Sequence, residues 1–299
     1  MSLIKNSPSW AVDEHKMFAD STRRLFDAEM APKIEKWAEQ GIVDRDFWKT
    51  VGQQGVMGGS IAEEYGGFGG GIGFDAITVY EQGRTGDTGW GYGIQSIVIH
   101  YLNAYGSEEQ KKKWLPKLVS GDSVAAIAMT EPGTGSDLQN VQTYAEKDGN
   151  HYKINGSKIF ITNGHTADLV VIVAKTDRNA GAKGVSLIVL ETEGAEGFRR
   201  GRNLKKLGMK GSDTAELFFE EFGEHREAFN RFVAADLPHL FADHRTKLKP
   251  MSVRVYNGMI QSGSYVRAVR IAIITHKNLP RRFPLPSDGY VRAEKVARV

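Results

Sequence analysis

The chain has 299 residues, with 39 Lys and Arg, 36 Asp and Glu and no Cys, and its formal charge is +3 with His neutral. At about 100–200 residues per domain, this length predicts about two domains. The lack of cysteine excludes disulfides, zinc–thiolate sites, iron–sulfur clusters and a thiol nucleophile. No stretch approaches the ~18 apolar residues that span a bilayer, and residues 1–8 lack a cationic segment that leads into an apolar core. We therefore expect a cytoplasmic protein with no membrane partner.

The first 120 residues are predicted to form helices joined by glycine-rich loops. Apolar residues recur at helical spacing, Pro32 interrupts the first run, Asp44 can cap the second, and Ser107 opens a capping sequence. Segment 63–73 holds too many glycines for a regular element. The predicted helices cover residues 13–31, 44–55, 74–80, 94–101 and 107–118.

From about residue 123 the apolar pattern changes to the alternation that is typical of strands. Asp148-Gly149 and Asn155-Gly156 predict tight hairpin turns on either side of a strand at 151–154. Because no helix intervenes, the strands predict a small barrel or sandwich of about 100 residues, and hence an α+β chain. The further predicted strands are 158–162, 169–174, 185–190 and 215–219.

The composition changes at residue 222. Residues 1–221 carry 25 basic and 30 acidic side chains, net −5, whereas residues 222–299 carry 14 basic and six acidic ones, net +8. The second segment holds five of the nine prolines and only four of the 34 glycines, which predicts irregular chain. A basic segment can bind nucleic acid, but few aromatic residues interleave its basic ones, so nucleic acid is a disfavoured partner.

Segment 66–73 fails the spacing tests for a phosphate loop. It contains neither G-x-G-x-x-G nor a P-loop ending in Gly-Lys-Ser/Thr, which argues against a dinucleotide-binding domain and favours a mobile loop between two helices. The histidines show no metal-binding spacing, and we expect no metal. No G-x-S-x-G elbow is present, although a Ser-His-Asp triad stays open.

Two later segments could bind an anion and a flat ring. Segment 129–137 combines backbone donors with the hydroxyls of Thr134 and Ser136, which suits a pyrophosphate, and a purely structural turn is an equal alternative. Segment 158–164 presents Phe160, which could pack on a planar cofactor, and Thr162, which could donate to it. Taken alone, Phe160 is more often a core residue of a barrel.

These two segments occur in this order about 30 residues apart, and together they resemble the acyl-CoA dehydrogenase family of flavoproteins. The resemblance covers residues 11 to about 221. It is supported by Glu63-Glu-Tyr-Gly-Gly-Phe-Gly, by the segments 105–111 and 114–122, by Leu207-Gly-Met-Lys-Gly-Ser-Asp-Thr, and by 216–220.

The resemblance implies an α-helical amino-terminal domain at 11–122, a small middle β-barrel at 123–221 and a carboxy-terminal helical bundle, with FAD between barrel and bundle. Family members remove the α-proton of an acyl-CoA thioester with a Glu base and pass the β-hydrogen as hydride to flavin N5. The product is a trans-2-enoyl-CoA of fatty acid β-oxidation, and the electrons leave through an electron-transferring flavoprotein. The resemblance thus implies a homo-oligomeric oxidoreductase with FAD as cofactor and acyl-CoA as substrate.

The resemblance also implies roles for particular residues. Thr130 would hydrogen-bond the isoalloxazine edge, Ser136 the pyrophosphate, and Thr162 would sit near N5, while Phe160 stands where the family more often has Trp. The FAD-binding residues implied are Ile127, Met129, Thr130, Gly135, Ser136, Phe160, Ile161 and Thr162. The residues implied at the acyl-CoA side are Ser136, Ser212, Asp213 and Thr214.

Residues 222–299 depart from the family pattern. Neither the connector to the bundle nor the base motif is recognisable, and Glu224, Glu227 and Glu294 lie in no base motif, so the catalytic base is unknown. We hypothesise that an unrelated or frame-shifted segment replaces the bundle in a truncated, impaired enzyme. An acyl-CoA oxidase-like flavoenzyme and a non-catalytic flavin- or CoA-binding remnant are the alternatives.

Overall fold

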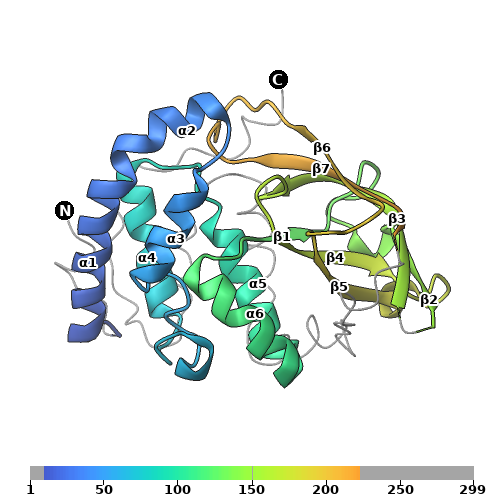
Figure 1. Cartoon of the computed structure of the whole chain (residues 1–299), viewed down its shortest axis with the longest axis horizontal. Helices are drawn as coiled ribbons and strands as arrows, with labels where there is room; N and C mark the ends of the chain where they lie inside the picture. Colours follow the sequence, from blue (N-terminus) through green and yellow to red (C-terminus); the bar gives the residue numbers. More distant parts are fainter. Residues whose placement is uncertain (1–9, 150, 223–299) are drawn as a thin grey trace, which may run out of the picture.

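A helical part precedes a strand part (Figure 1), and the computed structural model describes residues 10–149 and 151–222. The helices end at Ser120 and the first strand begins at Ala125, so the predicted order of helices and then strands is confirmed. No helix within the described ranges is long and apolar enough to cross a membrane. The predicted replacement segment lies outside the described residues, except that the last strand ends at Phe222.

The predicted helices are present, with one correction at a helix start, and the helix at Ile34–Gln40 lies in none of the predicted ranges. Ser107 caps the last helix, since its hydroxyl accepts the Gln110 N–H (3.2 Å) and the Gln110 side chain accepts the Ser107 N–H (2.9 Å). Asp44 precedes its helix but does not cap it, because its carboxylate accepts hydrogen bonds from the side chains of Trp37 and Gln40 instead. The elements are α1 Asp13–Glu29, η2 Ala31–Lys33, α2 Ile34–Gln40, α3 Arg45–Gln53, η3 Glu63–Tyr65, α4 Gly73–Thr85, α5 Tyr92–Tyr105 and α6 Glu108–Ser120. The short 3-10 turn η3 lies in the glycine-rich segment, where no regular element is predicted.

Seven strands form one curled sheet, a half-barrel. Their order is β1-β4-β2-β3-β7-β6, and β5 pairs with β4 off this path. The strands are β1 Ala125–Ala128, β2 Tyr144–Asp148, β3 His151–Thr162, β4 Leu169–Lys175, β5 Val185–Glu191, β6 Phe198–Asn203 and β7 Thr214–Phe222, with short turns η4 Leu138–Asn140 and η5 Gly181–Gly184. The polar strand β6 is not predicted, because three of its six residues are Arg and no apolar alternation marks it.

One of the two predicted hairpin turns is wrong. The Asp148-Gly149 turn is confirmed, since β2 and β3 pair antiparallel from Asp148 onward. Asn155-Gly156 instead lies inside β3, at a shift in the register with β7. Gly156 has φ +148°, and a Cβ there would meet the Cα of Thr143 at 2.7 Å. Glycine at this position therefore permits a close approach within the sheet and does not reverse the chain.

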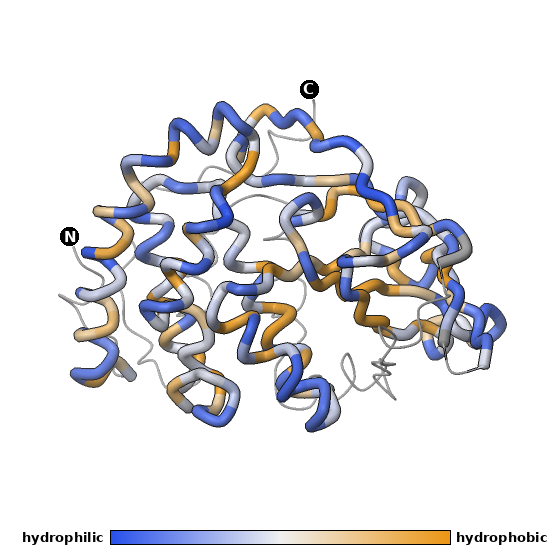
Figure 2. The backbone as a smooth tube through the Cα atoms, viewed as in Figure 1, coloured by the Kyte–Doolittle hydropathy of each residue, from blue (hydrophilic) through white to orange (hydrophobic). Residues whose placement is uncertain are grey.

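Apolar side chains pack the helical part against the sheet. One buried cluster joins Val98 of α5 and Leu115 of α6 to Val171 of β4 and Val189 of β5. Figure 2 shows the apolar stretches of the backbone tube concentrated where β1, β4 and β5 meet these helices. The contact fixes the position of β1, which leads into the first of the two predicted cofactor segments.

Polar side chains reinforce the same joint. Gln95 of α5 is fully buried, and its side-chain oxygen accepts the N–H of Ala125 at the start of β1 (2.6 Å). Arg45 of α3 donates to the carbonyl oxygen of Thr166 (3.0 Å) and forms an ion pair with Asp168. The helical part thus holds the strand part through directional contacts as well as through apolar burial.

Candidate functional site

The two predicted cofactor segments lie side by side at the end of β1. The N–H of Ile159 in β3 donates to the carbonyl oxygen of Thr130 (2.9 Å). The Lys158 ammonium group donates to the carbonyl oxygen of Met129 (3.0 Å), which is 29 residues away in the sequence. Neighbouring residues of β3 therefore hold neighbouring residues of the loop 129–136.

The loop 129–136 is closed on one side and open on the other. Glu131 and Thr134 exchange backbone hydrogen bonds of 2.8 and 3.1 Å, and the Thr134 hydroxyl donates to the carbonyl oxygen of Asn140 in η4 (3.0 Å). The Thr134 hydroxyl thus ties the loop to η4, which differs from its expected role as a donor to an anion. No heavy atom lies within 4 Å of the place that a Cβ would take at Gly133 or Gly135, and Ser136 is exposed. The open side can therefore receive an anionic group.

A buried ion pair lies beneath this loop. Lys158 Nζ and Glu131 Oε1 are 2.8 Å apart, and the two side chains are 0% and 4% exposed. Burial lowers the pKa of Lys158 to about 8, although the charge of Glu131 opposes that shift. Burial raises the pKa of Glu131, but the N–H of Gln142 and the Lys158 ammonium group outweigh it and hold that pKa below its ordinary value. Both groups are therefore mainly charged at neutral pH.

Phe160 turns outward at a break in β3. Its φ is +61°, its side chain is 63% exposed, and the register with β7 shifts between Lys158 and Ile161. The alternative that Phe160 is a core residue is therefore wrong, and Ile161 is the buried neighbour at 2% exposure. A bulky side chain in the left-handed region costs about 1–2 kcal/mol, and such strain concentrates at functional sites. The exposed ring offers a face to a planar group.

The far end of β3 is locked to the start of β1. Thr162 pairs with Thr214 of β7, and the next residue, Asn163, is 1% exposed with φ +62°. The Asn163 side-chain amide donates to the carbonyl oxygens of Gly91 (3.1 Å) and Ala125 (3.0 Å). These bonds fix Thr162 relative to the helical part.

The predicted acyl-CoA residues before and in β7 lie near Thr162 but are buried. Ser212, Asp213 and Thr214 are 3%, 4% and 7% exposed. The Asp213 carboxylate accepts the N–H groups of His165 (2.7 Å) and Thr166 (3.1 Å), and burial raises its pKa above the ordinary value. Asp213 thus holds the chain after β3, and contact with an acyl-CoA stays a prediction for these residues.

The predicted FAD residues fall into two groups by exposure. Ile127 and Ile161 are buried in the apolar core, so only their backbone atoms can meet a ligand. The other residues lie at the surface or close beneath it. Met129, Thr130 and Thr162 are half-buried, and Gly135, Ser136 and Phe160 are exposed.

Sequence reasoning misses Lys158, Glu131 and Asn163 as parts of this site. A lysine within an apolar strand is a usable signal, because lysine is almost never fully buried without a partner. The identity of that partner is not readable, since Glu131 lies 27 residues earlier.

Comparison with known proteins identifies the family. A family model for the amino-terminal domain of acyl-CoA dehydrogenases matches residues 12–122, and the model for their middle domain matches residues 126–222. The chain belongs to the acyl-CoA dehydrogenase family. The fold expected from the resemblance is thereby confirmed for the helical part and the strand part.

Relatives and a solved structure agree with this family. The chain is 48% identical over 211 residues to the mitochondrial long-chain specific acyl-CoA dehydrogenase of Sus scrofa, across 70% of this chain and 49% of the relative. It is 40% identical over 212 residues to the mitochondrial isovaleryl-CoA dehydrogenase of Solanum tuberosum, across 70% and 51%. A crystal structure of acyl-CoA dehydrogenase from Geobacillus kaustophilus superposes with a TM-score of 0.75 at 33% identity, covering 90% of this chain and 76% of that one. The chain spans about half the length of the curated relatives it matches.

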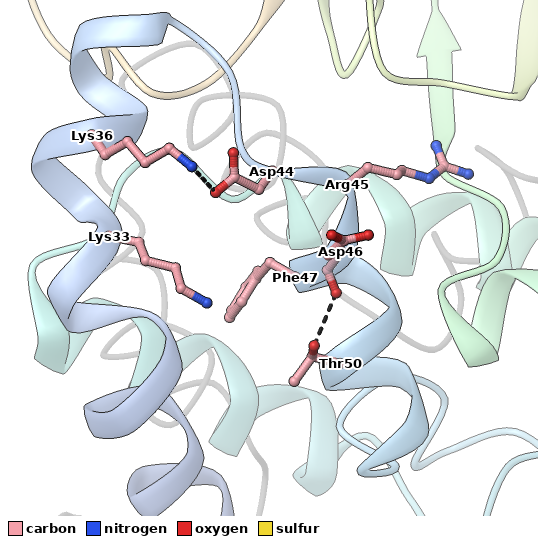
Figure 3. A pocket seen from close by; sticks show the side chains of 7 residues that line it. All are labelled: Lys33, Lys36, Asp44, Arg45, Asp46, Phe47 and Thr50. Carbon is pink, nitrogen blue, oxygen red and sulfur yellow. Dashed lines mark hydrogen bonds and ion pairs between the residues drawn. The ribbon is translucent and has the colours of Figure 1, made fainter.

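A separate hollow of about 340 Å³ lies in the helical part of this acyl-CoA dehydrogenase chain (Figure 3). Its lining residues include none of the predicted FAD or acyl-CoA residues. In Figure 3, Lys36 points to Asp44 (2.7 Å), and Arg45 points away from the hollow, toward the strand part that it binds. Because internal carboxylates already pair these cations, the hollow is a weaker anion site than the open loop 129–136.

The sequence leaves a Ser-His-Asp triad open, and one cluster of the described residues contains these three residue types. Its geometry is not that of a catalytic triad. Ser60, His100 and Asp75 lie together, but Nε2 of His100 is 3.4 Å from both the Ser60 hydroxyl and an Asp75 oxygen. A triad needs the serine and the aspartate on opposite ring nitrogens. The Ser60 hydroxyl instead donates to Asp75 (2.8 Å), so this cluster serves helix packing.

Proposed function

We propose that the chain binds FAD and oxidises an acyl-CoA thioester to a trans-2-enoyl-CoA. Membership of the acyl-CoA dehydrogenase family supports this cofactor and this reaction class, because its members are FAD-dependent oxidoreductases. The observation that carries the proposal is the edge made by the open loop 129–136 and the exposed ring of Phe160.

The residues at this edge have the chemistry that FAD requires. Bound FAD would supply the acceptor for the hydride that leaves the substrate. The exposed backbone at Gly135 and the Ser136 hydroxyl would bind phosphate oxygens, and the ring of Phe160 would pack on a flat face. The hydroxyls of Thr130 and Thr162 would donate to heteroatoms of the ring. Since the main-chain bonds and Asn163 fix both threonines in advance, their dipoles need no reorganisation during the reaction.

No buried carboxylate of the described residues is free of hydrogen bonds, and none of them is proposed as the proton acceptor. Each of these carboxylates already accepts at least two hydrogen bonds or ion pairs, and they are Asp75, Glu81, Asp87, Glu131 and Asp213. Glu224, Glu227 and Glu294 lie outside the described ranges. A missing general base costs typically 10²–10⁴-fold in rate. A flavin-binding protein without dehydrogenase activity is therefore the second candidate.

The finer assignments are proposals, and the choice of substrate rests on the relatives. A long-chain acyl-CoA is the first substrate to test, because the relative at 48% identity is long-chain specific by name and the one at 40% is named for isovaleryl-CoA. An electron-transferring flavoprotein is the proposed electron acceptor, and a homo-oligomer is the proposed assembly. A cytoplasmic location is also a proposal, whereas both of these relatives are mitochondrial by name.

The visible spectrum of the purified full chain tests the proposal. We expect a yellow protein that retains FAD after gel filtration and bleaches when a long-chain acyl-CoA is added without oxygen. Colour without bleaching would select the non-catalytic candidate, and oxygen consumption with the substrate would select an oxidase. A colourless protein that gains no flavin from added FAD would contradict the proposal.

A matched pair of variants tests whether FAD binds at the edge made by the loop 129–136 and Phe160. Phe160 and Phe68 are both exposed, at 63% and 47%, but Phe68 lies in the glycine-rich loop of the helical part. We expect Phe160→Ala to weaken FAD binding by about tenfold, the equivalent of about one aromatic contact, and Phe68→Ala to leave it unchanged. An equal loss of FAD affinity in both variants would show that FAD does not bind at this edge.

A further inference from the structure

Lys158 is a buried charged residue that the proposed reaction does not use. Its side chain is 0% exposed and therefore contacts neither solvent nor a ligand at the open side of the loop. Charged lysines are rarely buried, and the desolvation of a buried ion pair often exceeds its electrostatic gain. The presence of Lys158 at this position therefore calls for a role beyond simple stability.

The contacts of Lys158 all converge on the cofactor loop. Its ammonium group donates to the carbonyl oxygen of Met129 (3.0 Å) and to the carboxylate of Glu131 (2.8 Å). The same carboxylate accepts the N–H groups of Gln142 (2.5 Å) and Thr143 (2.9 Å), which lie on the way to β2. The Lys158 ammonium group thus holds the start of the loop directly. Through Glu131 it also holds the chain at Gln142 and Thr143, just before β2.

The position of Lys158 on β3 links this clamp to the exposed aromatic ring. The N–H of the next residue, Ile159, donates to the carbonyl oxygen of Thr130 (2.9 Å), and Phe160 follows with its left-handed backbone. Lys158 thus binds the first residue of the loop, and Ile159 binds the second. Phe160, the next residue of β3, presents its ring. A displacement of the Lys158 head group would change the spacing between the ring and the loop.

We propose that Lys158 is a positioning residue whose ammonium group holds the loop 129–136 in the shape that receives the cofactor. The inference rests on the proposed function for the identity of that cofactor. Since the pKa of Lys158 is about 8, the group is mainly charged at neutral pH and can donate to both acceptors.

A double variant separates positioning from stability. Lys158→Met leaves Glu131 as a buried charge without its cation, so this variant is expected to unfold at lower urea concentration. Lys158→Met combined with Glu131→Gln removes both charges, and we expect it to recover part of that loss, because the new amide keeps one oxygen for the backbone N–H groups of Gln142 and Thr143. The carbonyl oxygen of Met129 still lacks its charged donor in the double variant. The loop is therefore expected to stay loosened in a protein that is more stable than the single variant.

Amide hydrogen exchange measures the loop directly and needs no cofactor. The N–H groups of Glu131 and Thr134 are hydrogen-bonded to each other's carbonyl oxygens, so their exchange reports the closed turn. We expect exchange at these amides to be at least about tenfold faster in the double variant, together with an about tenfold higher FAD dissociation constant. If the single variant does not fold, the double variant decides the question alone.

The ion pair of Arg23 and Glu81 supplies the matched control. It joins α1 to α4 at 2.6 Å, and the Glu81 side chain is 1% exposed. We expect Arg23→Met to lower stability while loop exchange and FAD affinity stay as in the natural chain. A double variant that regains stability with normal loop exchange would make Lys158 a merely structural residue and overturn the inference. If the natural chain binds no FAD, the proposed function fails, and loop exchange still decides the role of Lys158.

Discussion

The helical part and the strand part use the left-handed backbone region differently. In the helical part every described residue with positive φ is a glycine, and Gly41, Gly86 and Gly121 stand at the ends of α2, α4 and α6. In the strand part three residues with side chains adopt positive φ, namely Phe160, Asn163 and Met209. Glycine enters this region without steric cost, whereas residues with a Cβ are strained there.

The difference shows where the molecule stores strain. Phe160 and Asn163 flank the end of β3 at the proposed FAD edge, and Met209 precedes Ser212, whose N–H donates to the Met209 carbonyl oxygen (3.0 Å). The described helical part thus carries no side chain in the left-handed region. The strand part carries strain at Phe160, which presents its ring to the proposed site, and at Asn163, which holds the adjoining chain, a distribution that is typical of functional sites.

The largest expected loss of stability is at Gly52, where we test whether a glycine is required because α3 packs closely on α6. A Cβ at Gly52 of α3 would lie 2.0 Å from the carbonyl oxygen of Ser120 at the end of α6, and Gly52 has no positive φ. We expect Gly52→Ala to lower the free energy of unfolding by about 3 kcal/mol in urea titrations. Gly71→Ala is the control, since nothing lies within 4 Å of its Cβ position, and its effect should stay within about 0.5 kcal/mol. A loss below about 1 kcal/mol for Gly52→Ala would refute the close packing of α3 on α6.

A smaller effect separates strain from hydrogen bonding at Asn163. Asn163→Ala removes the donors to Gly91 and Ala125 and keeps a Cβ in the left-handed region, so we expect a loss of about 2–3 kcal/mol. Asn163→Gly removes the same donors but relieves the strain, and it should be about 1 kcal/mol more stable than the alanine variant. Parallel denaturation curves measure the difference. Equal stabilities would show that this position stores no strain.

The smallest effect has the opposite sign and lies at Phe160. Because its ring is largely exposed, Phe160→Gly loses little burial and relieves the left-handed strain, so we expect the cofactor-free protein to gain up to about 1 kcal/mol. The same variant should bind FAD about tenfold more weakly, since the stacking face is gone. Thermal unfolding and FAD titration measure the two effects. A variant that loses both stability and affinity would mean that Phe160 supports the fold.

The sequence predicts the helical part well because its signals are local. The capping residues Ser107 and Gln110 lie three positions apart, and apolar periodicity marks a helix wherever one face packs on a core. Asn155-Gly156 fails as a turn because pairing with β2 on one side and β7 on the other overrides a dipeptide preference. Strand pairing depends on partners far along the chain, which a local pattern does not contain.

At the candidate site the motifs are predictable and the directions of their side chains are not. The alternation of a regular strand would place Phe160 and Thr162 on one face, but the register shift between Lys158 and Ile161 breaks that alternation. Phe160 therefore turns outward, while Lys158 becomes buried under the loop. The family resemblance supplies the candidate residues, and only the three-dimensional arrangement shows which of them are exposed.

The contact of Arg45 with Asp168 has a consequence for the order of folding. The two residues are 123 positions apart, so their meeting requires the closure of a long stretch of chain. Closing a longer loop costs more chain entropy, and contacts between distant positions form more slowly than local ones. We expect the helical part to collapse first on leaving the ribosome, with the Arg45 contact among the late events. Until α5 and α6 dock on β4 and β5, the apolar face of the sheet stays exposed, which favours aggregation of the half-folded chain.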